Sequence, residues 1–533
     1  MALVERVKGM SIAAALANRA INEPEGAFLV HQDRTVTFGQ VETRSDALAA
    51  SFHSLGIEAG DRVALLLPPC PEFVVAMFAA AKLGAVIVPM NPRLTRPELQ
   101  YMLRHSETVL AVTAENHGGE DYLAVFDELL PQLPELQYVV TVGDEDLWYD
   151  DQIFQFEDLL SAGGGRDFPT LEVTPDKDPF AILYTAGTMG KPKGVELTHA
   201  NILEVARETV FHLGLSAEDR VIGVTAFFHI FGLGPGILGS ILAGSSLILQ
   251  AGFGAAETLA LIQRHRATVH YGVPTLFSTG LIEQREASLD LSSLRVALAA
   301  GGPAPDELIR SVEKELCADF RVAYSLTETS SVVSMTGPSD PPEKRLHTVG
   351  RPLPGVEVLI LNNEGTPLPV ESVGEIALKG PGLMRGYYRQ PQETRRAKRD
   401  DGFLLTGDLG MLDEEGYLHL VGRRREVIIR GGFSVYPREV EYRLQAHPAV
   451  REAVVVGVSD DVLGEAICAC IVPIEGAIVT GPEIKDWCRV ALADYKVPDL
   501  VRFLDDFPRT GTGKPRRVEL ARMIQAELMS RKD

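Results

Sequence analysis

The chain has 533 residues, enough for several domain-sized cores, and 45% hydrophobic with 23% charged residues is the composition of an ordinary globular protein. Its formal net charge of −22 argues against nucleic acid as a partner and against an anionic membrane surface, because both favour a basic protein face. A site for a polyphosphate would have to be locally positive within an acidic body.

The apolar stretch at residues 11–17 is cut off by Asn18 and Arg19, so it is too short for a secretory signal and predicts an amphipathic helix. The five cysteines are scattered, and only Cys468 and Cys470 are close together. They lie in an apolar run in which alternate residues of a strand share a face, and no second Cys/His pair at zinc-like spacing accompanies them. We expect buried structural thiols, no zinc site and a reducing, cytoplasmic location.

The first four hundred residues repeat one theme: an apolar strand, a glycine-marked turn and an amphipathic helix. Residues 72–83 have a helical pattern, and helical patterns also separate several of the predicted strands. Strands are predicted at 63–67, 85–88, 109–112, 180–184, 246–249 and 294–299. This alternation predicts an α/β fold with largely parallel sheets covered by helices on both faces, in which ligands bind beyond the carboxyl ends of the strands.

Directly after the strand at 180–184 comes a short basic, glycine-rich segment that reads Tyr184-Thr185-Ala186-Gly187-Thr188-Met189-Gly190-Lys191-Pro192-Lys193-Gly194. Its glycines free the backbone so that several N–H groups can point at one anion, while the threonine hydroxyls and Lys193 add donors and charge. The spacing is not that of a Walker A loop, because no Ser or Thr follows the lysine. The alternative is an ordinary surface turn, but this composition after a buried strand favours phosphate binding.

No residue from 230 to 256 is charged, which raises the alternative of a membrane span. Several glycines and Pro235 break the stretch, and Gly244-Ser245-Ser246 has the composition of a turn before a strand at 247–249. We therefore predict a buried helix–turn–strand here and no integral membrane span.

After residues 351–355 the pattern changes to short strands punctuated by glycines, which predicts a small β-rich subdomain at about 353–424. Its strands are predicted at 356–361, 374–378 and 417–421. A compact α+β segment follows, with helices at 437–446, 482–492 and 517–530 and strands at 453–457 and 466–471. The charged link Arg423-Arg424-Arg425-Glu426 marks the predicted boundary between an N-terminal domain, 1–424, and a C-terminal domain, 425–533.

The segment at 184–194 resembles the phosphate loop of the adenylate-forming superfamily, which contains acyl-CoA synthetases, firefly luciferase and the adenylation domains of peptide synthetases. The family's loop reads Y-T-S-G-T-T-G-x-P-K-G; here Ala186 replaces the usual Ser and Met189 the usual Thr, so two hydroxyl donors are lost. The resemblance implies a large N-terminal adenylation domain and a small, mobile C-terminal domain. It also implies that the ATP phosphates are bound by Thr185, Gly187, Thr188, Gly190 and Lys193.

Two further motifs of the same family follow along the chain. Gly301-Gly302-Pro303 resembles the loop that packs on adenine, and Tyr324-Ser325-Leu326-Thr327-Glu328 resembles Y-G-x-T-E. The resemblance implies that Tyr324 stacks on adenine, Thr327 approaches phosphate and Glu328 helps to hold Mg²⁺. One carboxylate plus substrate phosphates fits the preference of Mg²⁺ for keeping several waters. Ser325 stands where glycine is usual and borders the acyl pocket in relatives.

The ribose, hinge, thiol and catalytic motifs of the family lie between residues 406 and 514. Thr406-Gly407-Asp408 resembles T-G-D and Gly422-Arg423 the G-R pair, which implies that Asp408 and Arg423 bind the ribose. Arg425 falls at the family's hinge, where Asp or Lys is usual. Gly432 matches the glycine that lines the pantetheine tunnel for coenzyme A. Lys514, in the turn Thr510-Gly511-Thr512-Gly513-Lys514, matches the lysine that bridges the substrate carboxylate and the α-phosphate during adenylation.

The acyl site is predicted around Phe227-Phe228-His229-Ile230-Phe231-Gly232, which resembles the family motif F-H-x-x-G beside the carboxylate. We expect His229, Phe231, Gly232 and Ser325 to line an apolar pocket; the alternative for His229 is a satisfied core histidine. No Asp is present at 225–234 to meet an ammonium group, which argues against an α-amino acid. We predict a medium- or long-chain fatty acid as substrate, with an aryl or arylpropenoic acid as the rival.

Together these resemblances imply an AMP-forming acyl-CoA synthetase, with ATP and coenzyme A as co-substrates and Mg²⁺ as the metal. The predicted catalytic residues are Lys514, Lys193, Thr185 and Glu328. Two alternatives stay open: transfer of the acyl group to an amine or a carrier protein, and a catalytically inactive binding protein that retains the fold. A homodimer also stays open.

Overall fold

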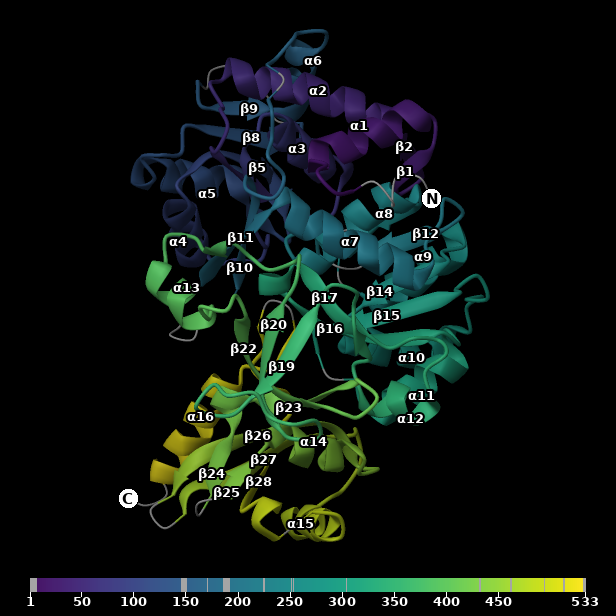
Figure 1. Cartoon of the computed structure of the whole chain (residues 1–533), viewed down its shortest axis with the longest axis vertical. Helices are drawn as coiled ribbons and strands as arrows, with labels where there is room; N and C mark the ends of the chain where they lie inside the picture. Colours follow the sequence, from purple (N-terminus) through teal and green to yellow (C-terminus); the bar gives the residue numbers. More distant parts are fainter. Residues whose placement is uncertain are drawn as a thin grey trace.

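The computed structural model describes residues 7–530 except 145–150, 170, 186–191, 224–225, 251, 253, 303, 431–432, 461–462, 493 and 511–512. The described part is elongated, with the N-terminal elements (purple and blue) at one end and the C-terminal elements (green to yellow) at the other (Figure 1). Two large sheets and one small sheet form the N-terminal part, and another small sheet forms the C-terminal part (Figure 1).

The first large sheet has eight strands in the order β21-β11-β10-β4-β3-β5-β8-β9. Every neighbouring pair from β10 to β9 is parallel, whereas β10, β11 and β21 pair antiparallel with one another in turn. The strands are β3 (Arg62–Leu66), β4 (Val86–Pro89), β5 (Thr108–Ala114), β8 (Tyr138–Val142), β9 (Ile153–Gln155), β10 (Pro179–Thr185), β11 (Lys193–Thr198) and β21 (Gly386–Tyr387). A separate small hairpin joins β6 (Asn116–His117) and β7 (Glu120–Asp121).

The second large sheet has nine strands in the order β18-β17-β16-β15-β14-β12-β13-β1-β2. Its central pairs from β1 to β16 are parallel, and both edges are antiparallel. The strands are β1 (Ala27–His31), β2 (Arg34–Thr37), β12 (Arg220–Gly223), β13 (Ser246–Leu249), β14 (Val269–Gly272), β15 (Val296–Ala300), β16 (Phe320–Leu326), β17 (Ser331–Met335) and β18 (Arg351–Pro352).

Helices cover both large sheets and supply their apolar cores. One core joins residues of both sheets with α1 (Ile12–Asn22), α2 (Phe38–Ser54), α3 (Pro71–Lys82), α6 (Phe156–Gly163), α7 (His199–Leu213) and α8 (Gly239–Ala243). A second packs α9 (Ala255–His265), α10 (Pro274–Ala287), α11 (Asp306–Glu315) and α12 (Pro342–His347) on the nine-stranded sheet. A third packs α4 (Arg96–Ser106) and α5 (Tyr122–Leu129) on the eight-stranded sheet.

Local signals begin and end these helices where the sequence provides caps. Thr37 with Gln40 and Thr198 with Asn201 form capping boxes at the starts of α2 and α7. α7 ends at Gly214, whose φ of 59° is the left-handed conformation that glycine adopts at little cost. The following turn leads into β12 of the nine-stranded sheet.

The small β-rich sheet and the C-terminal part complete the fold. Four antiparallel strands, β19 (Glu357–Leu361), β20 (Gly374–Lys379), β22 (Leu404–Leu412) and β23 (Leu418–Arg423), form the β-rich sheet, with α13 (Pro391–Ala397) inserted before β22. The C-terminal sheet contains β24 (Ile428–Arg430), β25 (Phe433–Val435), β26 (Val450–Asp460), β27 (Gly464–Pro473) and β28 (Leu500–Phe503). α14 (Pro437–Gln445) and α15 (Gly481–Arg489) cover one face, and α16 (Arg517–Ser530) covers the other.

The predicted α/β class, with two parallel-rich sheets in a large N-terminal part and a smaller C-terminal part, is confirmed. The uncharged stretch at 230–256 forms a buried π-helix (Gly232–Leu238), α8, a turn at Gly244 and β13, as the helix–turn–strand prediction requires. Among the described residues, no helix combines the length and apolar character needed to cross a membrane. The domain boundary at 424/425 and the mobility of the C-terminal domain stay predictions.

The cysteine pair also lies as predicted. Cys468 and Cys470 are buried on the face of β27 that packs against α16, while Ala469 between them faces the opposite core. Their sulfur atoms are 4.0 Å apart.

Candidate functional site

Three of the predicted site residues lie where strands of the two large sheets end. Thr185 is the last residue of β10, Gly301 follows β15 directly, and Glu328 lies in the 3₁₀ turn Thr327–Thr329 after β16. All three strands have parallel neighbours, and the carboxyl ends of such strands are where ligands bind in α/β sheets. The two sheets therefore bring together segments that are more than a hundred residues apart in the sequence.

The phosphate segment is the tip of the β10–β11 hairpin. Thr185 and Lys193 are directly paired across the two strands, so the predicted loop spans the residues between them. Its residues Gly187, Thr188 and Gly190 lie outside the described residues. Lys193 places its Nζ atom 2.5 Å from Oε2 of Glu393 on α13 and 4.8 Å from the centre of the Tyr387 ring.

Glu328 is the predicted metal ligand. The hydroxyl of Tyr387 donates to its Oε1 atom at 3.0 Å, and its own backbone carbonyl accepts from the backbone N–H of Met384 at 2.9 Å. Within the described ranges, no group of three or more His, Cys, Asp or Glu side chains forms a metal site. A single half-buried carboxylate is the donor set expected where Mg²⁺ is held mainly by substrate phosphates and water. Thr327, beside it, is also half-buried.

The predicted ribose site joins two buried residues, Tyr324 and Asp408, to Arg423, whose side chain is 46% exposed. Asp408 on β22 is directly paired with Arg423 on β23, and the Arg423 Nε lies 3.0 Å from Asp408 Oδ1. The Tyr324 hydroxyl donates to Asp408 Oδ2 at 2.6 Å. Burial and the adjacent Asp408 carboxylate hold the pKa of Tyr324 well above its ordinary value, so the phenol stays a proton donor. The predicted adenine and ribose residues thus meet through Asp408.

The predicted adenine loop lies next to the predicted catalytic lysine. Gly301 has a φ of 83°, which a residue with a Cβ adopts only with strain. A Cβ at Gly301 would lie 3.9 Å from the Nζ atom of Lys514, and one at Gly302 would lie 3.6 Å from the ring of Pro274. A lysine of the C-terminal part thereby reaches the strand ends of the nine-stranded sheet.

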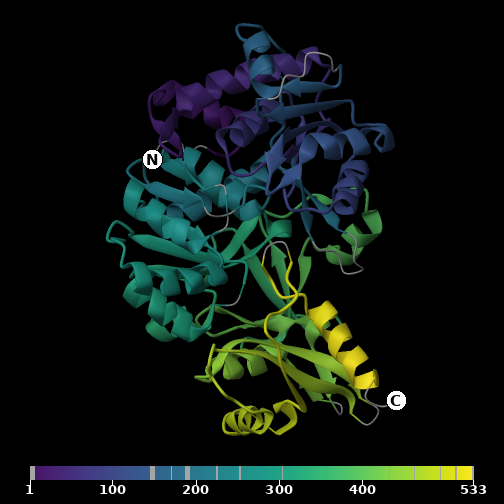
Figure 2. The ribbon, with the colours of Figure 1, turned by 180° about the vertical axis from the view of Figure 1, so that it is seen from behind.

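Lys514 is presented by a tight turn before α16. The Thr510 backbone N–H donates to the Lys514 carbonyl at 2.8 Å, and the Lys514 N–H donates to the Thr510 hydroxyl at 3.1 Å. The yellow segment that precedes α16 reaches from the C-terminal sheet towards the N-terminal part (Figure 2). Burial by the surrounding protein and the nearby Arg423 cation lower the pKa of Lys514, although part of the side chain stays exposed.

Of the predicted acyl residues, His229 interacts electrostatically with Lys514. Burial and the Lys514 cation lower the pKa of His229 to about 4, so the imidazole is neutral at physiological pH. Phe231 is buried, and its ring centre lies 5.4 Å from that of Tyr271 on β14. Gly232 opens the π-helix, a rare element that is frequent at functional sites. Ser325 is half-buried on β16 and directly paired with Val332.

The predicted hinge and thiol route are only partly described. The backbone of Arg425 lies in the 3₁₀ turn Arg424–Glu426, between β23 and β24. Arg424 on the same turn lies 2.6 Å from Glu375 of the β-rich sheet. Gly432, predicted to line the pantetheine tunnel, lies outside the described residues.

Sequence reasoning missed three side chains that contact the predicted site: Tyr387, Glu393 and Arg509. Tyr387 and Glu393 reach Glu328 and Lys193, as described above, and Arg509 donates to the carbonyl of Gly513 at 3.1 Å beside Lys514. Each is an ordinary polar residue in a polar segment, so neither composition nor spacing distinguishes it. Only the tertiary contact identifies these residues.

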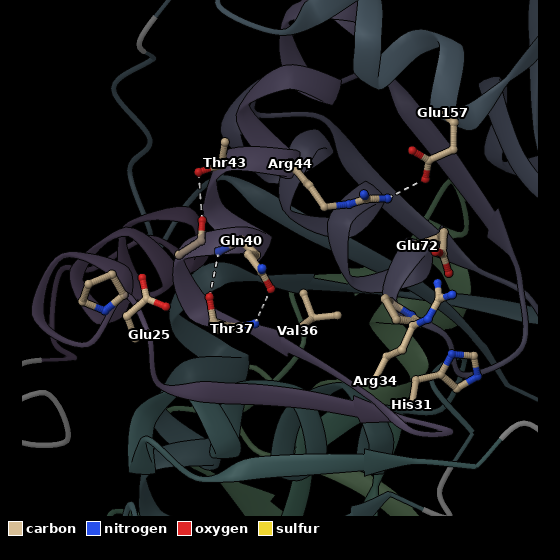
Figure 3. Close-up of a pocket in the computed structure, with 13 residues that line it drawn as sticks. Glu25, His31, Arg34, Val36, Thr37, Gln40, Thr43, Arg44, Glu72 and Glu157 are labelled. Carbon is tan, nitrogen blue, oxygen red and sulfur yellow. Dashed lines mark hydrogen bonds and ion pairs between the residues drawn. The ribbon is translucent and has the colours of Figure 1, made fainter.

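A surface hollow of about 790 Å³ lies elsewhere, beside β2 and the start of α2 (Figure 3). Polar side chains dominate its lining, and the Arg44–Glu157 ion pair, at 2.6 Å, closes one side. None of the predicted site residues lines it.

Comparison with known proteins supports the motif-based interpretation. A family model described as AMP-binding enzyme matches residues 16–388, and a second, described as AMP-binding enzyme C-terminal domain, matches residues 439–514. The medium-chain acyl-CoA ligase ACSF2, mitochondrial, of Homo sapiens is 32% identical over 533 residues, which cover 95% of this chain and 86% of that protein. The long-chain-fatty-acid–CoA ligase of Bacillus subtilis (strain 168) is 32% identical over 532 residues, which cover 95% of this chain and 93% of that protein.

Among solved structures, the chain is similar to the anthranilate CoA ligase AuaEII in complex with anthranoyl-AMP. The TM-score is 0.89 at 26% sequence identity, over 98% of each chain.

Proposed function

The chain belongs to the AMP-binding enzyme family, and on that premise we propose that it is an AMP-forming acyl-CoA synthetase. It activates a carboxylic acid with ATP to give an acyl-adenylate and pyrophosphate. It then transfers the acyl group to the thiol of coenzyme A, giving acyl-CoA and AMP.

The observation that carries the proposal is the meeting of four distant segments at one site. Lys514 of the C-terminal part lies beside Gly301, and its charge helps to lower the pKa of His229 at the predicted acyl site. The Asp408 carboxylate at the predicted ribose site raises the pKa of Lys514 against the effect of burial. A cation that interacts with both a predicted acyl-binding and a predicted ribose-binding residue is suited to bring a carboxylate and an α-phosphate together. A binding protein without catalysis has no need of this arrangement.

The first step joins two anions, so the residues must neutralise charge and align the reactants. A carboxylate oxygen attacks the α-phosphorus, the bond to the bridging oxygen breaks, and pyrophosphate leaves with the electron pair. Lys514 bridges the carboxylate and the α-phosphate, while Thr185 and Lys193 bind the departing phosphates. The trio of Tyr324, Asp408 and Arg423 holds the nucleoside.

A Mg²⁺ ion held by Glu328 and the phosphates would supply further neutralisation of the polyphosphate charge. Thr185, Lys193 and Lys514 position the phosphates whose charge is neutralised. Tyr387 orients the Glu328 carboxylate through its hydroxyl.

The second step needs a different arrangement of the C-terminal domain. The thiol sulfur attacks the acyl carbon, the carbon–oxygen bond to the phosphate breaks, and AMP leaves. Lys514 occupies the site in the first step, so we propose a rotation about Arg425 that withdraws it and opens the route past Gly432.

The substrate favoured by this site is a medium- or long-chain fatty acid. Phe231 and Tyr271 form an apolar contact, and the π-helix beside them is apolar and fully buried. The names of the human and bacterial relatives, medium-chain acyl-CoA ligase and long-chain-fatty-acid–CoA ligase, support the same choice. The anthranilate CoA ligase similarity supports the aryl alternative.

An acid panel with ATP tests the first step. We expect pyrophosphate release to be fastest with fatty acids of about eight to sixteen carbons, because only an apolar tunnel gains binding energy with each added methylene, about 0.8 kcal/mol. A strict preference for benzoates or cinnamates would overturn the fatty-acid assignment while leaving adenylation intact.

Mass spectrometry of the products tests the acceptor. The purified protein is supplied with acid and ATP together with coenzyme A, an amine, or a phosphopantetheinylated carrier protein. Acyl-CoA as the main product supports the proposal, and an amide or acyl-carrier product without acyl-CoA contradicts it. We also propose a cytoplasmic location, which cell fractionation tests. Light scattering of the purified protein decides between a monomer and the homodimer that stays open.

A further inference from the structure

One short segment, residues 384–397, contacts both charged residues of the predicted phosphate site, Lys193 and Glu328. β21 and α13 belong to residues 384–397, inserted between β20 and β22 of the β-rich sheet but paired with the eight-stranded sheet. The Tyr388 N–H donates to the Gly194 carbonyl at 2.7 Å, and the Met384 N–H donates to the Glu328 carbonyl at 2.9 Å. The backbone of this segment is therefore fixed to the strand that carries Lys193 and to the turn that carries Glu328.

Within the segment, the Glu393 carboxylate bridges two cations. Its Oε2 atom lies 2.5 Å from Nζ of Lys193, and its Oε1 atom lies 2.6 Å from Nη1 of Arg396. The Lys193 and Glu393 side chains are 16% and 22% exposed, whereas Arg396 is 70% exposed. The hydrogen bond from Lys193 holds the pKa of Glu393 below its ordinary value, so the carboxylate is charged at neutral pH. A row of cation, anion and cation thus runs from the predicted phosphate site to solvent.

We propose that Glu393 is a positioning residue for Lys193. In the nucleotide-free site its carboxylate pairs with Lys193 in place of a phosphate. When the triphosphate binds Lys193, Arg396 becomes the partner that neutralises the Glu393 carboxylate. The inference rests on the proposed function, because it requires Lys193 to bind the phosphates.

Geometry and charge explain why Glu393 would exchange Lys193 for Arg396 as its partner. Lys193 carries one positive charge and lies over the Tyr387 ring, so its ammonium group has few places to go when the phosphates arrive. The phosphates displace the carboxylate by like-charge repulsion, and without a second cation a half-buried Glu393 would lose its only neutralising partner. Arg396 is already bound to the other oxygen, and its exposed side chain is free to follow the carboxylate.

This arrangement predicts opposite effects from two charge-removing variants. Glu393→Gln removes an internal competitor and should strengthen the binding of ATP and of free pyrophosphate by about three- to tenfold. Arg396→Gln leaves Glu393 paired with Lys193 alone and should weaken both by a similar factor of about three- to tenfold. In the double variant the Arg396 substitution should lose its effect, because the carboxylate through which it acts is gone.

Arg395 provides the matched control. It is exposed on the same helix and carries the same charge, but no ion pair joins it to Glu393 in the described part of the chain. Arg395→Gln should change binding only through the general loss of one positive charge, which 0.15 M salt screens.

Calorimetric titration of each full-length variant with Mg²⁺–ATP and with pyrophosphate gives the dissociation constants, and thermal unfolding confirms folding. Kinetics with ATP should show the changes in KM, and product inhibition by pyrophosphate should be stronger in Glu393→Gln. A role limited to packing α13 predicts weaker binding in both variants; that result, or equal binding in both, overturns the inference. Wild-type protein that binds neither ligand would instead overturn the proposed function. If Glu393→Gln does not fold, Arg396→Gln with normal or tighter binding is sufficient to reject the inference.

Discussion

The two lysines predicted to serve the same reaction lie in regions that are built differently. Lys193 begins β11 of the eight-stranded sheet, is directly paired with Thr185, and is held by Glu393 and by the ring of Tyr387. Lys514 lies in a turn of the C-terminal part, whose sheet has two apolar cores of its own. Gly301, beside which its Nζ atom lies, belongs to the N-terminal part.

The difference separates a fixed charge from a removable one. The ion pair and the ring contact of Lys193 lie wholly within the N-terminal part. In the proposed rotation of the C-terminal domain, Lys193 therefore keeps these contacts, whereas Lys514 leaves the site. A two-step reaction in which only the first step needs the second lysine can therefore be controlled by docking alone.

Removal of Lys514 should have the largest effect. Lys514→Ala should lower the rate of adenylation by about 10²–10³-fold or more, because a preorganised cation at the reacting phosphate is lost. Thioester formation from supplied acyl-adenylate should stay near the wild-type rate. Acid-dependent isotope exchange between pyrophosphate and ATP measures the first step, and acyl-CoA formation from synthetic acyl-adenylate measures the second.

Lys314, an exposed lysine on α11, provides the control, and Lys314→Ala should leave both steps unchanged. Equal loss of both steps in Lys514→Ala would remove the distinction between the two lysines.

Removal of Lys193 should have a smaller effect, and mainly on the binding of ATP and pyrophosphate. Lys193→Ala should raise KM for ATP and weaken pyrophosphate binding by about 10–100-fold, because one charge on the leaving phosphates is lost. The maximal rate should fall less than in Lys514→Ala. Steady-state kinetics and calorimetry measure these parameters; a variant that changes kcat alone would show that Lys193 acts in the transition state rather than in phosphate binding.

The pH dependence should also separate the two regions. The active form of Lys514 is the ammonium ion, and burial together with Arg423 lowers its pKa, so its proton is lost at a lower pH than in an ordinary lysine. Adenylation should therefore fall as the pH rises through that lowered value, by about tenfold for each further pH unit, while thioester formation should not. Both half-reactions are measured from pH 6 to pH 10.

Lys514→Arg tests the assignment, because a guanidinium stays charged throughout this range and its residual adenylation should be independent of alkaline pH. An unchanged alkaline limb in this variant would assign the titration to another group.

Loosening the turn that presents Lys514 should have the smallest effect. Arg509 contacts the Gly513 carbonyl and lies 2.6 Å from Glu452 of the C-terminal sheet. Arg509→Gln should lower adenylation by about three- to tenfold and spare thioester formation, because the lysine is still present but less well oriented. Arg516→Gln, which removes an exposed pair with Glu519, is the control and should leave both rates unchanged. An equal loss in both variants would indicate a general effect of charge.

Local patterns were sufficient for the fold class and for part of its strands and helices. The strand predicted at 246–249 and the helix predicted at 517–530 have the observed bounds. The strand holds a short continuous apolar run after the Gly244 turn and is buried throughout. The helix places Leu520, Ile524 and Leu528 four residues apart on its packed face. The turn at Gly244 was likewise predicted from the sequence, since the left-handed backbone conformation that ends α8 favours glycine. The long strand β22, which carries Asp408, was not predicted, because Gly407 and polar residues interrupt its apolar alternation.

The sequence by itself determined which chemistry the chain carries. The sequence shows local features directly. These are the glycine-rich turns after apolar strands and the lysines, carboxylate and tyrosine of known motifs. Only the tertiary structure decided which of these residues meet and which unremarkable residues support them. Glu393 lies 200 positions from Lys193, and its role depends on two strands becoming neighbours, which no local pattern encodes.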